Sequence, residues 1–522
     1  EYDEPIFDDN SQQRIVVIGS GIGGMSAGSL FAKNGHLVTV LEQNPDHIGG
    51  HGRTLTIEGL RFCMGPQYVW NFGEGMLGSR FMEYVGIKEE NPFLPMAEDG
   101  FERFFVGQKR HTNYLFADVK VPKGFERFCK LLVSLFPEEK ENIVRLFADM
   151  DEIYSTYRAA LDDIVMSESR LLLATKLLLS DDLPFATKLK FGTTSYITLK
   201  AFFDQYNLSN LVRRLLYGHG GIFAENENAM SAIAYIAATG NYHSGAWYPQ
   251  KGFHHFFNSM SKVIEQNGGQ VCKGMKVVEL KTEDSKVTKV VTDSGEEFEC
   301  DYVFSNISPR LTAGLLTNVD VSFDYAPAHS IPTCCIGLRK GLPGIQEMRG
   351  SNYWWQDGMP VDYEKPDVLD KPKMLFIASP TANGFGCAKG VDRDGLVVFC
   401  PGNYVQERSI HSRGPNAVEE FKSRLADDIV HTIDENVFPG IKEHVLFTHV
   451  LTSITIERQT LGEMGNAYGR RLSAEEVMKG PILDNGMPEN LFNVSGTKND
   501  AGIASGIFGS LRLFAKLTGK EV

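Results

Sequence analysis

The 522-residue sequence contains little cysteine and no run of basic residues. Its eight cysteines are scattered without a C-x-x-C pair, which argues against a zinc or dithiol site and predicts free thiols in a reducing compartment. The one adjacent histidine pair, His254-His255, would not face a single ligand sphere on a helix, so no metal site is predicted. The net charge of −14 opposes contact with polyphosphate backbones, and nucleic acid is not an expected partner.

The sequence also lacks a convincing membrane span. The longest uncharged run, Ile15 to Ala32, has 18 residues, but five glycines and three serines make it typical of a strand, a turn and a helix. The chain starts at Glu1 rather than Met, which is compatible with a removed targeting peptide. Location stays open between a soluble and a peripheral membrane protein, in the cytoplasm or a plastid-like compartment, and the oligomeric state is also open.

The N-terminal stretch predicts a strand–helix–strand unit that binds a dinucleotide. A β-branched strand, RIVVIG, leads into GSGIGG, where Gly19, Gly21 and Gly24 have the G-x-G-x-x-G spacing and Gly23 lies between them. Such glycines permit a tight turn, close approach of a pyrophosphate and packing of the next helix. The second strand, HLVTVLEQ, ends at Glu42, which can accept hydrogen bonds from ribose hydroxyls and disfavours NADP.

The residues after Glu42 favour FAD over NAD. A Gly49-Gly50 pair and then Gly65 and Pro66 offer points of close backbone approach along an extended cofactor. In these features the sequence resembles the FAD-dependent phytoene desaturase, carotenoid isomerase and retinol saturase family, within the flavin amine oxidase superfamily.

Two departures from the family pattern occur in this run. The match continues through Gly59 and Phe62, but Cys63 stands where the family usually has an acidic residue. Arg53 lies two residues after the arginine of the common Gly-Gly-Arg form, and the resemblance implies that it contacts FAD.

The resemblance extends along much of the chain. It implies that Val277, in a strand after YPQKGFHHFFNSMSKVIEQNGGQVCKGMK, contacts the adenine through its backbone. It also implies that NLFNVSGTKNDAGIASGIFG is the second flavin motif, with Gly496, Gly502 and Ile503 near the isoalloxazine. Covalent attachment in the superfamily commonly uses a C-terminal cysteine, and none follows Cys400, so non-covalent FAD is predicted.

The positions of these motifs predict an α/β fold with a discontinuous Rossmann-type FAD-binding domain and a mixed α+β substrate domain. The FAD-binding domain would comprise 1–90, 249–310 and 440–522, and the substrate domain 91–248 and 311–439. Within 91–248, helical spacing is broken at Pro137, whereas SIPTCCIGL and DGLVVFC in 311–439 are typical of strands. A second G-x-G-x-x-G is absent, which argues against flavoenzymes with two Rossmann units.

Candidate substrate-binding features lie in the first insertion. Leucine-rich residues 169–192 form either a buried helix or a membrane-dipping lid, which would make the protein peripherally membrane-associated. His219 and His243 are either structural or proton donors near a substrate. The aromatic residues that flank the flavin motifs are Tyr68, Trp70, Phe72, Trp247 and Tyr248.

The sequence therefore predicts an FAD-dependent desaturase, isomerase or saturase. It would act on C=C or C–C bonds of a long apolar polyene, carotenoid-like or retinoid-like, by hydride transfer with flavin, and no catalytic residue is assigned. The alternatives are a polyunsaturated fatty acid double-bond isomerase, a flavin amine oxidase, and a non-catalytic FAD-bound lipid carrier. A fatty acid would need a cation, for which Arg213, Arg214 and Lys200 are candidates.

Overall fold

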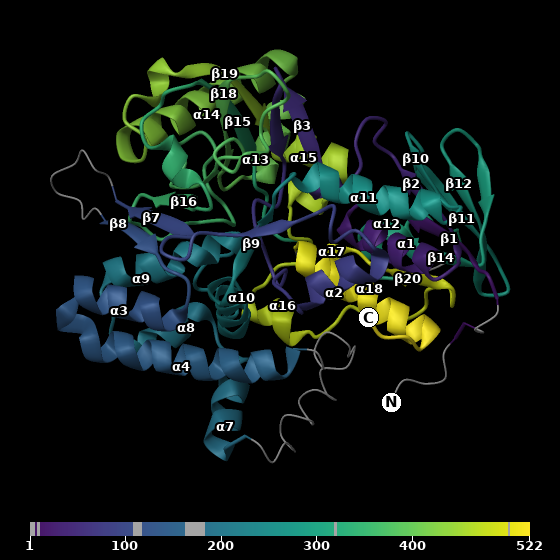
Figure 1. The fold of residues 1–522 in the computed structure, drawn as a ribbon, viewed down its shortest axis with the longest axis horizontal. Coiled ribbons are helices and arrows are strands. Elements are labelled where there is room, and N and C mark those ends of the chain that lie inside the picture. Colours follow the sequence, from purple (N-terminus) through teal and green to yellow (C-terminus); the bar gives the residue numbers. More distant parts are fainter. Residues whose placement is uncertain (1–5, 8–10, 108–116, 162–182, 318–320, 500–501) are drawn as a thin grey trace.

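Figure 1 shows the computed structural model of the chain, which describes residues 6–7, 11–107, 117–161, 183–317, 321–499 and 502–522. Most of the leucine-rich stretch 169–192 lies outside the described residues, so both of its interpretations stay predictions. Within the described ranges, no helix combines the length and the apolar character that crossing a bilayer requires.

A five-stranded parallel sheet carries the dinucleotide motif. Its strands, in spatial order, are β10 (Gln270–Lys273), β2 (Leu37–Glu42), β1 (Arg14–Ile18), β14 (Tyr302–Ser305) and β20 (Leu491–Asn493). The central strand β1 pairs in parallel with both β2 and β14, with Ile15 opposite Val38 and Tyr302. Residues almost 500 positions apart in the chain therefore share one sheet.

The two faces of this sheet are covered by different layers. The covering elements are α1 (Ile22–Lys33), α11 (Phe253–Gln266), α18 (Ile503–Thr518), β11 (Val277–Glu283), β12 (Lys286–Thr292) and β13 (Glu297–Glu299). Ile15 and Val17 pack in a cluster with the three helices, whereas Val16 and Ile18 pack with the antiparallel sheet β11–β12–β13. Because both faces are buried, RIVVI is a continuous apolar run rather than an alternating one.

The first insertion is mostly helical. Its helices are α3 (Phe125–Leu135), α4 (Lys140–Ala159), α7 (Phe185–Thr194), α8 (Leu199–Phe203), α9 (Asn210–Tyr217) and α10 (Ala232–Ser244). α3 ends just before Pro137 and α4 begins just after it, as the sequence predicts. The apolar residues at helical spacing, such as Phe128, Leu132, Ile143 and Phe147, are buried in one core cluster.

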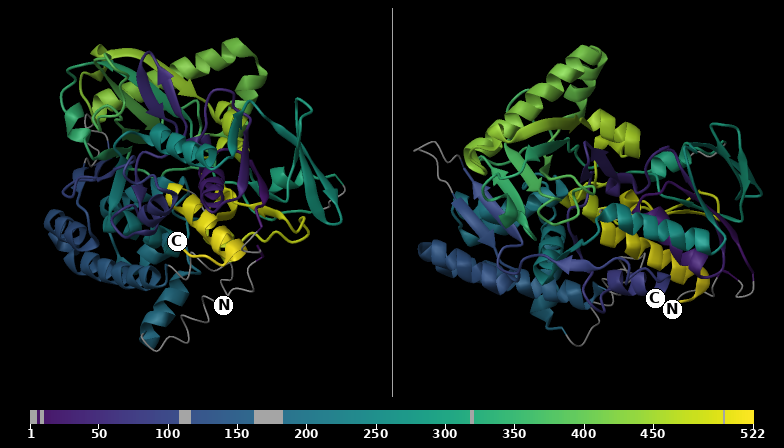
Figure 2. Two further views of the ribbon diagram at one scale, coloured as in Figure 1. Left: turned by 45° about the vertical axis from the view of Figure 1, so that its right-hand side comes forward. Right: turned by 45° about the horizontal axis from the view of Figure 1, so that its top comes forward.

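A seven-stranded sheet forms a separate hydrophobic core beside the parallel sheet and the helical insertion. Its strands, in spatial order, are β19 (Val445–Leu451), β15 (Thr333–Arg339), β18 (Arg393–Phe399), β17 (Met374–Ala378), β16 (Asn352–Gln356), β7 (Glu102–Val106) and β8 (Ala117–Val121). The helices α13 (Tyr404–Ser412) and α14 (Pro415–Asn436) accompany it, and Phe421, Leu425 and Ile429 of α14 pack with the strands. Both views in Figure 2 show the long helix α14 at the end of the molecule away from the termini.

The remaining helices and strands are short. They are β3 (Thr54–Ile57), β4 (Leu60–Cys63), β5 (Val69–Trp70), β6 (Phe93–Pro95), β9 (Ala246–Pro249), α2 (Leu77–Val85), α12 (Pro309–Ala313), α15 (Ser453–Thr460), α16 (Ala474–Met478) and α17 (Gly496–Asn499). The β3–β4 hairpin packs Leu60 and Phe62 against Cys335 and Val397 of the seven-stranded sheet. Residues 64–68, which join β4 to β5, therefore lie between the parallel sheet and the seven-stranded sheet.

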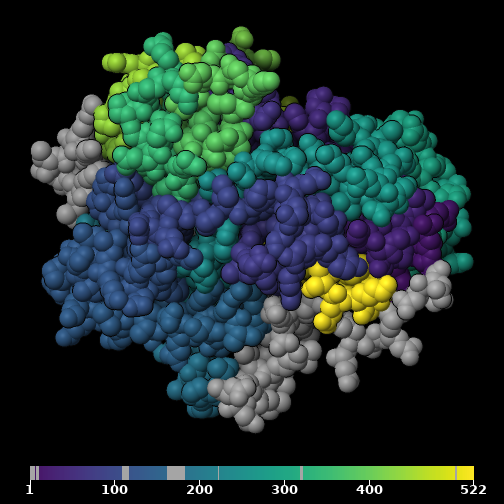
Figure 3. Space-filling view, in the orientation of Figure 1, coloured from purple at the N-terminus to yellow at the C-terminus, as the bar shows by residue number. Residues whose placement is uncertain are grey.

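The architecture confirms the predicted α/β class with a Rossmann-type sheet and a mixed substrate region. In Figure 3 the purple N-terminal, teal central and yellow C-terminal residues lie together on one side, whereas the blue first insertion and the green second insertion occupy the other. The parallel sheet takes strands from 1–90, 249–310 and 440–522, but β19, also within 440–522, belongs to the seven-stranded sheet. The domain boundaries themselves stay predictions.

Candidate cofactor and substrate cavity

A cavity of about 540 Å³ reaches from the dinucleotide turn to the seven-stranded sheet. The residues predicted to bind the cofactor that line it are Gly19, Gly21, Glu42, Gly50, Arg53, Gly65, Pro66, Val277, Gly496, Gly502 and Ile503. The structure therefore gathers residues from the two ends and the middle of the chain around one space.

The turn after β1 is built for close approach of a ligand. Gly19 has a φ of +88°, and Gly21 is the N-cap of α1, whose first turn lines the cavity at Ile22. The carboxylate of Glu42 accepts hydrogen bonds from the backbone N–H and the hydroxyl of Ser20, at 3.0 and 2.5 Å. Ser20, which sequence reasoning missed, thus fixes the acid that was predicted to bind ribose.

Gly23 and Gly24 do not line the cavity, unlike the other predicted residues. The helix begins at Ile22, three residues earlier than the Met25 predicted from the sequence, so both glycines lie inside α1. A β-carbon on Gly23 would lie 1.9 Å from the carbonyl oxygen of Val494, and one on Gly24 would lie 2.2 Å from that of Gly19. Their glycine requirement therefore comes from packing of the helix against the sheet.

Arg53 is a buried cation at the edge of the cavity. Its guanidinium donates to the carbonyl oxygen of Gly50 at 3.1 Å and to Oε1 of Gln459, while Nε has no partner among the described residues. Burial lowers the pKa of Arg53 to about 10, which leaves it charged at neutral pH. No carboxylate in the described ranges pairs with it, so the arrangement fits an anionic group such as a cofactor phosphate.

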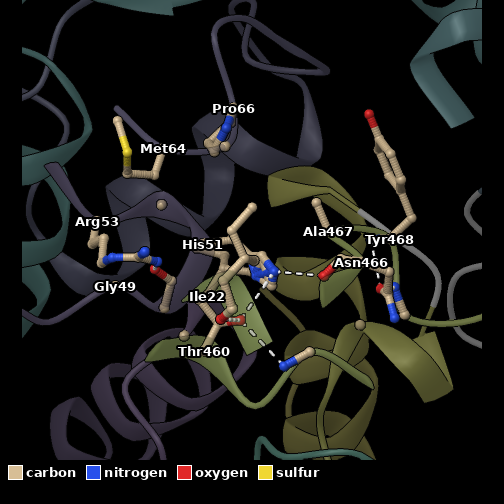
Figure 4. A pocket seen from close by; sticks show the side chains of 18 of the residues that line it. Ile22, Gly49, His51, Arg53, Met64, Pro66, Thr460, Asn466, Ala467 and Tyr468 are labelled. Atoms are coloured by element: carbon tan, nitrogen blue, oxygen red, sulfur yellow. Dashed lines mark hydrogen bonds between the residues drawn. The ribbon is translucent and has the colours of Figure 1, made fainter. Parts of the chain in front are cut away.

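His51 occupies the centre of the cavity wall, between Arg53 and Tyr468 in Figure 4. Its Nε2 lies 2.8 Å from the carbonyl oxygen of Asn466, and because a carbonyl only accepts, Nε2 carries the proton. Burial and then the charge of Arg53 lower the pKa of His51 to about 4, so the ring is neutral at pH 7. Sequence reasoning gave His51 no role, although its position directly after Gly49-Gly50 was a signal.

The C-terminal motif adds a helix N-terminus to the cavity. Gly502, with a φ of +105°, caps α18, and Gly502 and Ile503 both line the cavity. A β-carbon on Gly496 would meet no atom within 4 Å, which leaves open space beside the start of α17. The N-terminus of the 16-residue helix α18 favours negative charge at this point.

The wall next to the helical insertion is aromatic and uncharged. It consists of Tyr68, Phe223, Tyr242, Trp354, Phe376, Phe399 and Tyr468. The charged side chains among the described lining residues are Glu42, Arg53, Lys276 and Glu463, none of which belongs to this aromatic wall. Of the aromatic residues singled out in the sequence, Tyr68 and Trp70 line the cavity, whereas Phe72, Trp247 and Tyr248 do not.

Comparison with known proteins identifies the family. The profile of the flavin containing amine oxidoreductases matches residues 22–329, more than half of the chain. The chain belongs to this family. Membership confirms the predicted FAD cofactor and makes the protein an enzyme of the flavin oxidoreductase class.

Relatives of the same length carry a carotenoid name. The chain is 23% identical over 516 residues to 4,4'-diaponeurosporene oxygenase from Staphylococcus aureus strains USA300 and NCTC 8325. The alignment covers 94% of this chain and 95% of each relative. This agrees with the resemblance to carotenoid-modifying enzymes.

Solved structures share the fold at low identity. An oxidoreductase from Methanosarcina mazei superposes with a TM-score of 0.61 at 16% identity, covering 96% of this chain and 100% of the other. Putrescine oxidase bound to putrescine gives 0.60 at 13%, covering 98% and 100%, and Rab GDI from Plasmodium falciparum gives 0.54 at 14%, covering 98% and 99%. These likenesses establish the fold alone.

Proposed function

We propose that the protein acts on C=C or C–C bonds of a long apolar polyene, carotenoid-like or retinoid-like, as an FAD-dependent oxidoreductase or isomerase. The observation that carries the proposal is the continuity of one cavity from the dinucleotide turn to an uncharged aromatic wall. The name of the staphylococcal relatives, which refers to the carotenoid 4,4'-diaponeurosporene, supports the same substrate class.

The lining residues define how FAD would be held. The turn at Gly19 and Gly21 would receive the pyrophosphate, Glu42 the ribose hydroxyls, and the backbone of Val277 the adenine. Arg53, a buried cation that pairs with no carboxylate of the described residues, would face an anionic part of the cofactor.

The remaining contacts would hold the flavin end. Gly50, Gly65 and Pro66 offer backbone surface, and the start of α18 at Gly502 and Ile503 would face the ring. When bound, the flavin supplies the two-electron chemistry, and the protein supplies position, exclusion of water and aromatic surface.

The three cations suggested to bind a fatty acid carboxylate already form ion pairs with carboxylates of the protein. Arg213 pairs with Asp204 at 2.7 Å and Lys200 pairs with the same carboxylate at 2.7 Å. Arg214 pairs with Glu227, and none of the three cations lines the cavity. This supports a hydrocarbon substrate over a fatty acid.

An amine substrate would need a free carboxylate or an aromatic cage beside the flavin. Glu463, which lines the cavity, already pairs with Arg310 at 3.2 Å and accepts a hydrogen bond from Tyr325 at 2.5 Å. Glu463 is therefore not a free partner for an ammonium group, and the choice between an amine and a polyene depends on which of them reacts with the flavin.

Anaerobic mixing of the FAD-loaded enzyme with a carotenoid, a retinol, a polyunsaturated fatty acid and putrescine tests the proposal. Flavin bleaching by the carotenoid or retinol indicates desaturation, and a polyene shift with oxidised flavin indicates isomerisation. Saturation would appear as reoxidation of pre-reduced enzyme. Bleaching by putrescine alone would replace the proposal with an amine oxidase, and binding of a polyene without any change in the flavin or polyene spectra would indicate a carrier.

A further inference from the structure

A buried carboxylate lies one hydrogen bond behind the aromatic wall of the cavity. Oε1 of Glu102, on β7, accepts hydrogen bonds from the hydroxyl of Tyr68 and from Nε1 of Trp354, the latter at 3.0 Å. Glu102 is 0% exposed and does not line the cavity, whereas both of its donors do. The hydroxyl of Tyr68, a residue that lines the cavity, is therefore hydrogen-bonded to a buried carboxylate that can accept its proton.

The second oxygen of Glu102 lies beside an imidazole. Oε2 contacts Nε2 of His219 without forming a hydrogen bond to it, and His219 is 1% exposed and packs against the rings of Phe101 and Phe104. The ring of His243 is 5.2 Å from that of His219, and burial followed by the charge of His219 lowers the pKa of His243 well below its usual value. Burying a carboxylate is costly unless it is paired and hydrogen-bonded; Oε1 of Glu102 accepts two hydrogen bonds, whereas Oε2 accepts none among the described residues.

We propose that Tyr68 is a catalytic residue that passes a proton between a carbon of the bound polyene and Glu102. The proposal rests on the proposed function, because removing or adding hydrogen across a carbon–carbon bond moves one proton along with each hydride. Of the two wall residues that donate to Glu102, Tyr68 and Trp354, Tyr68 has a hydroxyl oxygen that can also accept a proton, whereas the indole N–H of Trp354 only donates. His219 acts through Glu102 and is a positioning residue.

The geometry makes Tyr68 a neutral relay rather than a base. Burial and the charge of Glu102 raise the pKa of Tyr68 well above its ordinary value, so a tyrosinate is not formed in advance. The phenol already donates its hydrogen to Oε1, which leaves an oxygen lone pair for an incoming proton. Tyr68 can therefore take one proton as it gives up another, without acquiring charge.

The step balances in desaturation. One substrate C–H bond breaks, its proton goes to the oxygen of Tyr68, the former phenolic proton goes to Oε1 of Glu102, and the released electron pair forms the new π bond. The adjacent carbon loses a hydride, so the hydrocarbon is oxidised by two electrons and the family's flavin is reduced by two. Saturation is the reverse, with Glu102 returning the proton through Tyr68.

Tyr68→Phe tests the relay, with Tyr206→Phe as a matched control. Tyr68→Phe keeps the ring that packs 4.5 Å from Tyr242 but removes the relaying oxygen. Tyr206 is also buried and donates to a carboxylate, Asp149, at 2.6 Å, but it does not line the cavity. With the polyene that bleaches the wild type, bleaching should slow roughly 100-fold or more in Tyr68→Phe and stay unchanged in Tyr206→Phe. Flavin content and polyene affinity should be preserved in both variants.

Infrared difference spectroscopy of the wild type gives a readout of Glu102 that does not depend on a rate. The carbonyl band of a protonated carboxylic acid should appear as the flavin bleaches, shift in D₂O, and be absent in Glu102→Gln. This readout uses the wild-type protein alone. A wild-type spectrum without the band would therefore overturn the relay even if Tyr68→Phe and Glu102→Gln failed to fold.

The outcomes separate the two proposals. Polyene bleaching within threefold of the wild-type rate in folded, flavin-loaded Tyr68→Phe would overturn the relay and leave the proposed function intact. If no polyene changes the wild-type flavin or is itself changed, the proposed function fails and the relay fails with it.

Discussion

The side-chain amide of Asn306 lies directly beside the α-carbon of Gly21 in the dinucleotide turn. A β-carbon on Gly21 would be 2.2 Å from Nδ2 of Asn306, and both residues line the cavity. Asn306 follows β14, where its backbone N–H donates to the carbonyl oxygen of Ile18 at 2.8 Å. Gly21 therefore lines the cavity but has no room for a side chain, because Asn306 fills the position that a β-carbon would take.

We expect Gly21→Val to abolish FAD binding. The branched side chain would occupy the space proposed for the pyrophosphate as well as clash with Asn306. The measurement is the flavin-to-protein absorbance ratio after purification. Gly192→Val is the matched control, because a β-carbon there meets no atom within 4 Å.

A double variant separates the two causes. If the clash with Asn306 alone prevents binding, Gly21→Val combined with Asn306→Ala should recover FAD. If the pyrophosphate needs the space, the double variant should stay depleted. A normal flavin ratio in Gly21→Val would refute this use of the turn.

FAD should be released by acid precipitation of the protein. None of the described residues that line the cavity is a cysteine, and the sequence has none after Cys400. The yellow colour should therefore stay in the supernatant, with an absorbance that matches the flavin content of the native sample. Flavin that pellets with the protein and survives unfolding in detergent would show a covalent bond.

Contacts between residues close in the sequence could be predicted, whereas contacts between distant residues could not. Gly19, Gly21 and Glu42 belong to one strand–helix–strand unit, so local spacing was enough to predict that they meet. Glu102 meets Tyr68, 34 residues away, and Trp354 on β16, 252 residues away, and no local pattern encodes these contacts. His219 looked like one of two ambiguous histidines until the fold placed it against Glu102.

Apolar residues on α7 should contribute to membrane association. Phe185 and Leu189 are four residues apart on one helical face and are 78% and 56% exposed, and Figure 1 shows α7 projecting from the helical region. We expect Phe185→Ser with Leu189→Ser to reduce sedimentation with phosphatidylcholine vesicles about tenfold.

The control for this test carries two exposed apolar residues elsewhere, Val405 and Met478, each changed to Ser. Its vesicle binding should equal that of the wild type. Equal losses in the two double variants would show that α7 has no special part, and no binding by the wild type would remove the prediction altogether.

Glu407 should make the stability of the fold depend on pH. It is 0% exposed on α13, and its oxygens accept hydrogen bonds from the backbone N–H and the hydroxyl of Ser453, at 2.6 and 2.7 Å. Burial, opposed by the Ser453 bonds, raises the pKa of Glu407 from 4.5 to about 7. Glu407 therefore binds its proton more tightly in the folded state than in the unfolded state. Protonation of Glu407 therefore contributes fully to the free energy of unfolding below pH 4.5, and this contribution is lost as pH rises through 7.

Glu407→Gln is neutral at every pH and should lack this dependence. The free energy of unfolding of the wild type, minus that of the variant, should fall by up to about 3 kcal/mol between pH 4.5 and 8, since each pKa unit corresponds to about 1.4 kcal/mol. Urea unfolding at a series of pH values measures the difference, and Glu420→Gln, an exposed carboxylate on α14, serves as the baseline for losing one charge. A difference that stays constant over this range, or that rises with pH, would mean that Glu407 remains ionised inside the folded protein with Ser453 fully offsetting its burial.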